Sequence, residues 1–341
     1  MTRGARVGFV AQIAVLVFLV LLPSLVSLSG YQLHIVELIL VMIPLAIGLL
    51  ISMGHCGQIN LAQVALFGVG AYTTAILISR AQVDPWIATL AGTLAGGVMG
   101  MVVGLPSLRI RGHYLAIATL GLAVAAEAVF TAGGELTGGP LGIGRIPSLP
   151  GIDTSAGRDA GYYPLLVGVF AVTWVFARLL VSGPIGSAFG AIRDDYLAAK
   201  GMGVNVGAFQ LLAFTISGLL AGLAGSLYAT WSGYISPDSF RPAQMFFLLT
   251  ILVVGGMRSL PGVVVAATAL ILAREAFQQF EAYQLIIFGS LVVIVMLVAP
   301  DGLAGLASRT WKLVAKTAGG AVRGQTWQSL EPALPEDRKQ D

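Results

Sequence analysis

The sequence predicts an all-α polytopic membrane protein with about 10 transmembrane helices. Of its 341 residues, 57% are hydrophobic and only 10% are charged, whereas soluble domains carry about 25% charged residues. Apolar runs of about 20 residues, long enough to cross a bilayer as a helix, recur along almost the whole chain. These runs lack the alternation typical of a barrel strand, so helices are the structure that satisfies their backbone groups in lipid.

Ten apolar runs predict the ten spans. In chain order they cover 7–27, 32–51, 57–79, 85–107, 114–132, 162–182, 211–231, 243–257, 262–278 and 284–299. The first run follows a basic start, but its length and the lack of an A-x-A pattern after it favour a span over a cleaved leader. An even number of spans places both termini on one side.

The basic residues predict which side that is. With an inside N-terminus, fourteen of the nineteen basic residues lie inside: Arg3, Arg6, Arg109, Arg111, Arg178, Arg193, Lys200, Arg258, Arg309, Lys312, Lys316, Arg323, Arg338 and Lys339. The other five lie outside: Arg80, Arg145, Arg158, Arg241 and Arg274. This bias predicts an N-in, C-in orientation. Because the positive charges sit at helix ends and in the tail, the net charge of +3 does not indicate a nucleic-acid partner.

Two segments between spans are long. The outer stretch 133–161 is rich in Gly and Pro, which predicts an irregular loop that either meets a periplasmic partner or simply connects two spans. The inner stretch 183–210 contains good helix formers with a polar face, bounded by Gly186 and by Gly201 and Gly203. It predicts one short helix of about 10 residues on the cytoplasmic surface. Such a helix has no core of its own, so it must pack on its own bundle or on another subunit.

The domain organisation follows from these elements. Residues 1–306 are expected to form one transmembrane domain, and 307–341 a polar cytoplasmic tail. Glycines recur at four-residue spacing within spans, as in Gly92, Gly96 and Gly100, and again at Gly218 and Gly222. Small residues along one helix face predict close packing of membrane helices.

Polar residues interrupt the apolar pattern where the third span begins. His55, Gln58, Asn60 and Gln63 lie in or beside a flexible stretch, and such a stretch is tolerated at membrane depth where it lines a cavity or is buried in protein. These four residues are therefore candidates for a substrate path, with an ordinary inner loop as the alternative. Glu127, in the outer half of the fifth span, joins the candidates because charge inside a membrane is costly.

Several classes of activity lack support. Cys56 is the only cysteine, so neither an internal disulfide nor a cysteine metal cluster is expected. No metal site, cofactor or enzymatic activity is predicted, because His34 and His113 fall at no ligand spacing from His55 and no catalytic motif occurs. The chain also has no phosphate-binding G-x-x-x-x-G-K-[ST] motif. Transport would thus draw on an ion gradient, the substrate's own gradient or a separate ATPase.

Several segments resemble one family, the permeases of branched-chain amino-acid ABC importers of the LivM type. The matching segments are "GQINLAQVALFGVGAYTTA" at 57–75, "LRIRGHYLAIATLG" at 108–121, "TGGPLGI" at 137–143, "AIRDDYLAAKGMGVNVG" at 191–207, "LAFTISGLLAGLAGSLYA" at 212–229, "GYISPDSF" at 233–240, "VVGGMRSLPG" at 253–262 and "PDGLAGL" at 300–306. The resemblance runs from about residue 35 to residue 306.

The resemblance implies that segment 183–210 is the coupling helix that docks on an ATPase. The residues that would form this contact are Arg193, Asp194, Asp195, Ala198, Ala199, Gly201 and Gly203. The chain departs from the family at Tyr196, where an acidic residue is frequent, and at Ala208 and Gln210, which replace frequent basic residues. Ala62 and Gln63 likewise replace a common Gly-His pair.

The resemblance also implies the complex to which the chain would belong. The chain would be a multi-pass subunit of the bacterial inner membrane, embedded in lipid beside a homologous second permease, with two ATPase subunits and a periplasmic substrate-binding protein. ATP-driven closure of the ATPases would produce alternating access. Two alternatives remain open: a urea or short-amide permease of the same type, and a gradient-driven carrier or channel that works alone.

Overall fold

A computed structural model describes residues 29–152, 158–276, 289 and 290 of the chain. The expected first span 7–27, nearly all of the expected tenth span 284–299, and the tail 307–341 lie outside the described residues. The longer helices are α2 Gly30–Leu49, α3 Gln63–Ser79, α4 Pro85–Gly104, α5 His113–Ala132, α7 Arg158–Ser182, α8 Pro184–Asp194, α10 Val206–Ser232, α11 Pro242–Gly255 and α12 Leu260–Ala276. The short elements are η1 Leu50–His55, η2 Leu105–Leu108, α6 Gly134–Thr137, η3 Gly139–Leu141, β1 Ile143–Gly144, α9 Tyr196–Gly201, β2 Tyr234–Ile235 and η4 Pro237–Phe240.

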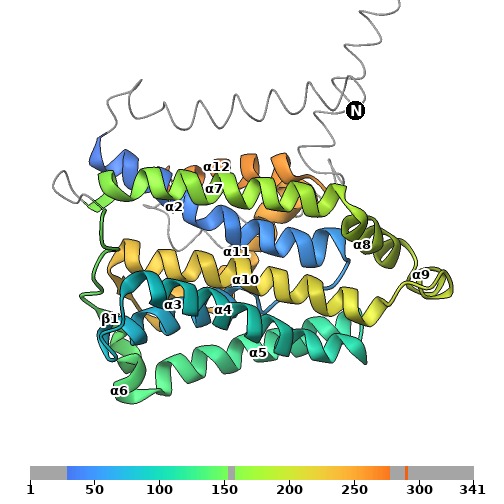
Figure 1. Ribbon diagram of the computed structural model, residues 1–341, viewed down its shortest axis with the longest axis horizontal. Helices are drawn as coiled ribbons and strands as arrows, with labels where there is room; N and C mark the ends of the chain where they lie inside the picture. The colour runs from blue at the N-terminus through green and yellow to red at the C-terminus, as the bar shows by residue number, and fades with distance from the viewer. Residues whose placement is uncertain (1–28, 153–157, 277–288, 291–341) are drawn as a thin grey trace, which may run out of the picture.

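The helices run back and forth along one axis and form a bundle (Figure 1). Each expected span from the second to the ninth coincides with one long helix, although the third helix begins only at Gln63. Five of the described helices are long and apolar enough to cross a membrane, and α3 and α11 are shorter apolar helices. The all-α class is thus confirmed, while the number of ten spans and the N-in, C-in orientation stay predictions.

Helix boundaries follow local side-chain chemistry. The Ser29 hydroxyl accepts a hydrogen bond from the backbone N–H of Gln32, and the Gln32 side chain accepts one from the N–H of Ser29, forming a capping box at the start of α2. The Asp84 carboxylate caps α4 by accepting from the N–H of Trp86 at 2.9 Å. Helix α10 ends at Ser232, and the next residue, Gly233, caps it with a φ of +70°, which suits glycine.

Glycines bring α4 and α10 into close contact. A Cβ placed on Gly96 would lie 2.6 Å from the Gly218 carbonyl oxygen and 2.6 Å from the Gly222 Cα atom, so no side chain fits between the helices. Gly100 meets the Phe214 carbonyl in the same way. The close helix packing predicted from the glycine spacing is therefore confirmed. Helix α10, packed on α2, α3 and α4, lies at the centre of the bundle.

The connection 133–161 contains more regular structure than the expected loop. Its described part holds α6, η3 and β1, and β1 pairs antiparallel with β2, Ile143 opposite Ile235. The Tyr162 hydroxyl accepts from the N–H of Leu149 at 2.9 Å and donates to the Thr230 carbonyl at 3.1 Å. The partner strand lies about ninety positions away along the chain, which is why local composition predicted only a loop.

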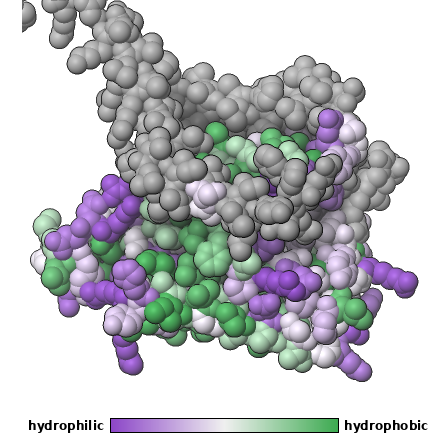
Figure 2. Space-filling model, turned by 180° about the vertical axis from the view of Figure 1, so that it is seen from behind, coloured by the Kyte–Doolittle hydropathy of each residue, from purple (hydrophilic) through white to green (hydrophobic). Residues whose placement is uncertain are grey.

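The two ends of the bundle carry different elements. Helices α8 and α9 lie at one end, and β1 and α6 lie at the other (Figure 1). Arg111, Arg193 and Arg258 make contacts at the α8–α9 end, whereas Arg80 donates to the Glu135 carbonyl at the other end. On the face in Figure 2, hydrophobic side chains dominate the middle and hydrophilic ones lie mostly toward the two ends. This is the arrangement that a surrounding bilayer favours.

Candidate functional site

The segment expected to form one surface helix forms two. Helix α8 begins at Pro184, after Gly183, and α9 ends at Gly201. Between them Asp195 adopts an extended conformation, with φ −153° and ψ 109°. Its carboxylate accepts hydrogen bonds from the N–H groups of Leu197 at 2.8 Å and Ala198 at 3.0 Å, so it serves as the N-cap of α9. The expectation of a single helix bounded by Gly186 was wrong, because an Asp in this position starts a new helix.

The helix pair presents an outward face and an inward face. Of the residues predicted to contact an ATPase, five are exposed: Asp194, Asp195, Ala198, Gly201 and Gly203. Arg193 is half-buried and Ala199 is buried, so the side chain of Ala199 faces the bundle.

Sequence reasoning missed two apolar residues on this outward face. Leu197 is 74% exposed and Met202 is 85% exposed. Large apolar side chains at a surface often mark a contact site. The signal was present in the sequence, since both residues lie in an otherwise polar or small-residue segment.

Arg193 attaches α8 to the end of α2. Its guanidinium donates to the carbonyl oxygen of Gly54 in η1, and its side chain lies so close to Gly57 that a Cβ there would be 2.9 Å from the Arg193 Cγ atom. Beside it, Asp194 forms an ion pair with Arg258, which precedes α12. Burial lowers the pKa of Arg193, and the charge of Arg258 acts in the same direction, while Asp194 opposes them.

Two ring contacts complete the attachment of the helix pair. The Arg111 guanidinium lies 3.2 Å from the ring centroid of Tyr196, a cation–π arrangement. Tyr196 therefore gives Arg111 an aromatic partner. Phe189 on α8 packs edge-on against Phe209 on α10, with ring centroids 6.2 Å apart. The helix pair is thus attached to η1, to α10 and to the residues that precede α5 and α12.

The chain between α2 and α3 departs from regular α-helix. Helix α2 widens into the π-helix η1 over Leu50–His55, a form that occurs mostly as short stretches, frequently at functional sites. Gly57 follows with a φ of +72°, and α3 begins only at Gln63. The backbone thus loses its helical hydrogen bonds over residues 57–62, and neighbouring side chains supply others: the Thr119 hydroxyl accepts from the N–H of Leu61 at 3.1 Å.

Four buried polar side chains connect the region between α2 and α3 to α10 through hydrogen bonds. Gln63 accepts at Oε1 from Asn60 at 3.0 Å and from the Ser217 hydroxyl at 2.7 Å. Its Nε2 donates to the carbonyl oxygens of Leu45 and Ser217, each at 3.2 Å. The hydroxyls of Ser52 and Ser217 lie 3.2 Å apart. We call Ser52, Asn60, Gln63 and Ser217 the polar cluster; all four are fully buried.

The structure brings together only two of the five candidate path residues, Asn60 and Gln63. Gln58 is buried nearby, its side chain donating to the Cys56 carbonyl at 3.4 Å. His55 lies at the α8–α9 end, and its Nε2 finds no hydrogen-bond partner among the described residues. Glu127 lies at the opposite end, 3.7 Å from Arg241, which also pairs with Asp238 at 2.7 Å.

The side chains of the polar cluster bond to one another and to nearby backbone carbonyls. Removing one hydroxyl from the cluster therefore tests how much these bonds contribute to stability. We expect Ser217→Ala to lower the free energy of unfolding by about 0.5–1.5 kcal/mol, because the Gln63 oxygen and the Ser52 hydroxyl each lose one of their partners. Thermal unfolding of the purified protein in detergent measures the loss. The matched control is Ser182→Ala, which removes an exposed hydroxyl bonded only to the Arg178 carbonyl of its own helix; an equal effect of both variants would contradict the prediction.

The polar side chains between α2 and α3, and those of α8 and α9, fix the local backbone through their hydrogen bonds. No group of His, Cys, Asp and Glu that could hold a metal ion occurs among the described residues. The class that the apolar bundle defines is that of a polytopic membrane protein. Comparison with known proteins gives the family. The chain belongs to the family described as the permease component of the branched-chain amino acid transport system, whose model matches residues 32–298.

Individual relatives agree with this assignment. The chain is 34% identical to the high-affinity branched-chain amino acid transport system permease protein LivM of Escherichia coli K12, over 92% of this chain and 78% of that protein. It is 23% identical to LivH of the same organism, over 76% of this chain and 90% of LivH. A permease protein of an autoinducer 2 import system, LsrC of Enterobacter sp. 638, is 30% identical over 50% of this chain and 47% of its own length. No solved structure matches the chain significantly.

Proposed function

We propose that this chain is a membrane-spanning subunit of a bacterial ABC importer that moves branched-chain amino acids across the inner membrane. In this proposal the chain pairs with a homologous second permease, two separate ATPase subunits bind on the cytoplasmic side, and a periplasmic binding protein delivers the substrate. The observation that carries the proposal is the similarity to LivM over nearly the whole chain. The similarity to LivH, a permease of the same kind of system, supports the paired arrangement.

The geometry of α8 and α9 supports an ATPase contact. The pair is attached firmly to the bundle through Arg193, Asp194 and Tyr196, while Leu197 and Met202 extend outward. A rigidly anchored element with an exposed apolar tip suits the transfer of force between subunits. A carrier that works alone has no use for such an element.

The contacts of Arg193 suggest how a movement of the helix pair would reach the bundle. Arg193 holds Gly54 in η1, and Ser52 of the same π-helix meets Ser217 on α10. Gln63, at the start of α3, binds Ser217 as well. A displacement of α8 would therefore be shared by α2, α3 and α10 through the polar cluster. We propose that this shared displacement is the local step of alternating access.

Uptake by the reconstituted complex tests the proposal. Proteoliposomes are prepared with this chain, its second permease and the ATPases. They should accumulate radiolabelled leucine only when ATP is enclosed in the vesicles with the ATPases and binding protein is added outside. Unlabelled isoleucine and valine should compete, and urea should not. Leucine uptake by this chain alone, without ATPases, would instead establish a carrier, and competition by urea in place of isoleucine would move the cargo to urea or short amides.

A further inference from the structure

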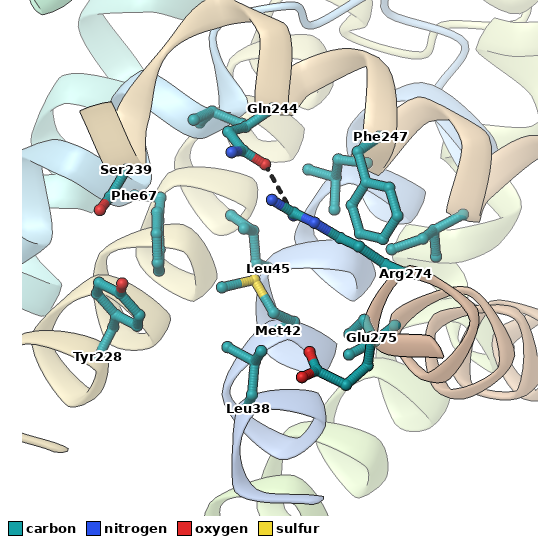
Figure 3. Close-up of a pocket in the computed structure, with 14 residues that line it drawn as sticks. Leu38, Met42, Leu45, Phe67, Tyr228, Ser239, Gln244, Phe247, Arg274 and Glu275 are labelled. Carbon is teal, nitrogen blue, oxygen red and sulfur yellow. Dashed lines mark hydrogen bonds between the residues drawn. The ribbon is translucent and has the colours of Figure 1, made fainter. Parts of the chain in front are cut away.

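A cavity of about 320 Å³ lies at the end of the bundle opposite α8 and α9. It opens between α2, α3, α10, α11 and α12, next to η4 (Figure 3). Its volume falls at the small end of the range for small-molecule sites, about 300–1,000 Å³. Under the predicted orientation this end faces the periplasm, where an importer receives its substrate.

Most of the cavity wall is aliphatic or aromatic. Leu38, Met42 and Leu45 line it from α2, and Leu248 lines it from α11. None of these four side chains carries a strong hydrogen-bonding group, and the polar lining residues Tyr228 and Ser239 come from α10 and η4. This part of the cavity therefore suits an aliphatic side chain of a ligand.

Two neighbouring residues on α12 add opposite charges to this wall. Arg274 extends toward Gln244, and its Nη1 donates to the Gln244 Oε1 atom at 3.2 Å. Its guanidinium also lies 5.3 Å from the ring centroid of Phe247. Glu275 enters the cavity on another side, closer to Leu38 in Figure 3, and its carboxylate accepts from the Tyr31 hydroxyl.

Each charged group retains capacity for a ligand. A guanidinium has several N–H donors in a plane and can bind a carboxylate through two of them, and Gln244 occupies one direction only. A carboxylate accepts several hydrogen bonds at once, so Glu275 can bind an ammonium group alongside partners such as Tyr31. Charged side chains near an apolar membrane cavity are costly, and that cost favours a functional reason for both.

We propose that this cavity is the outer binding site for the zwitterionic amino acid. The ligand carboxylate binds Arg274, its ammonium group binds Glu275, and its branched aliphatic side chain packs on Met42, Leu45 and Leu248. This assignment rests on the proposed function and deepens it by naming the substrate class the site accepts. Urea and short amides carry neither the pair of opposite charges nor the aliphatic group, so the cavity favours amino acids over them.

Thiol protection tests the site without depending on turnover. Because Cys56 is the only cysteine, Cys56→Ser provides a cysteine-free chain into which Met42→Cys is introduced within the full complex in proteoliposomes. A small charged thiol reagent added outside should modify this cysteine, and millimolar leucine should slow the modification while urea does not. The matched control is Leu141→Cys, at an outer position 82% exposed, where leucine should give no protection.

Charge removal then identifies the groups that hold the ligand. Arg274→Gln and Glu275→Gln should each raise the leucine concentration needed for protection about tenfold or more, since hydrogen bonds to charged groups contribute more than the roughly 1.4 kcal/mol that a factor of ten requires. Arg274→Lys should retain part of the affinity. Arg145→Gln, which removes an exposed arginine at the same end of the bundle, should leave protection unchanged.

The outcomes separate this inference from the proposed function. One outcome is that the complex accumulates leucine while the thiol reagent fails to modify the cysteine of Met42→Cys, or while leucine fails to protect it. Either result would show that the cavity assignment is wrong and would leave the proposed importer function standing. If protection follows the ethanolamine lipid content of the vesicles and not leucine, a lipid head group occupies the cavity and the assignment is also wrong. A complex that takes up no leucine at all overturns the proposed function.

Discussion

Replacement of Gly96 by valine should prevent stable folding of the bundle. The Gly96 Cα faces α10 so closely that even a Cβ atom would lie 2.6 Å from the Gly218 carbonyl oxygen, a backbone atom that cannot turn aside. Overpacking in a core costs about 1–3 kcal/mol when side chains can adjust, and here the helices themselves must separate. We expect a loss beyond that range, against a total stability of about 5–15 kcal/mol for a folded domain. Size-exclusion chromatography of a fluorescent fusion in detergent measures the folded fraction.

Gly121→Val on α5 provides the matched control for Gly96→Val. A Cβ at Gly121 meets no atom of the described residues within 4 Å, and the change in helix propensity from glycine to valine is the same at both sites. The control should therefore elute as wild type. A folded, monodisperse Gly96→Val protein would mean that α4 and α10 do not pack through their glycines as the structure shows.

The sequence predicted the bundle well because the signals for membrane helices are local. An apolar run of sufficient length defines a span without knowledge of its neighbours, and glycines at four-residue spacing mark a face that packs closely. The same local reasoning placed the third helix too early. Residues 57–62 alternate between apolar and polar side chains and give no clear helix start. The contacts that accompany the start at Gln63, from Leu61 to Thr119 and from Gln63 to Ser217, are visible only in the structure.

The candidate sites were harder to predict because they combine distant segments. Asn60 and Gln63 were predicted to line a substrate path, which stays a prediction, and Ser217, the partner of Gln63 on α10, lies 154 positions beyond it. Glu127 was also predicted to line the substrate path, yet it lies near the opposite end of the bundle from His55, beside Arg241. The sequence also offered no reason to assign Arg274 and Glu275 a common role. Only the structure shows that both line one largely apolar cavity.

The second large effect is expected at the tip of the helix pair. Leu197→Asp combined with Met202→Asp should reduce ATP-driven leucine uptake to background in the reconstituted complex. Burial of each apolar side chain contributes about 1.5–3 kcal/mol, and an unpaired carboxylate placed in an apolar contact costs more than the lost burial alone. Because both residues are exposed in this chain, the substitutions should leave its own thermal unfolding unchanged.

Conservative changes at the same two positions provide the control. Leu197→Met combined with Met202→Leu keeps volume and apolar character, so uptake and the stimulation of ATP hydrolysis by loaded binding protein should both persist. The aspartate variant should lose this stimulation and should no longer retain the ATPases during purification. If it instead transports leucine at the wild-type rate with ATPases bound, the coupling contact lies elsewhere on the cytoplasmic surface, and the anchoring of α8 by Arg193 would serve the stability of the bundle alone.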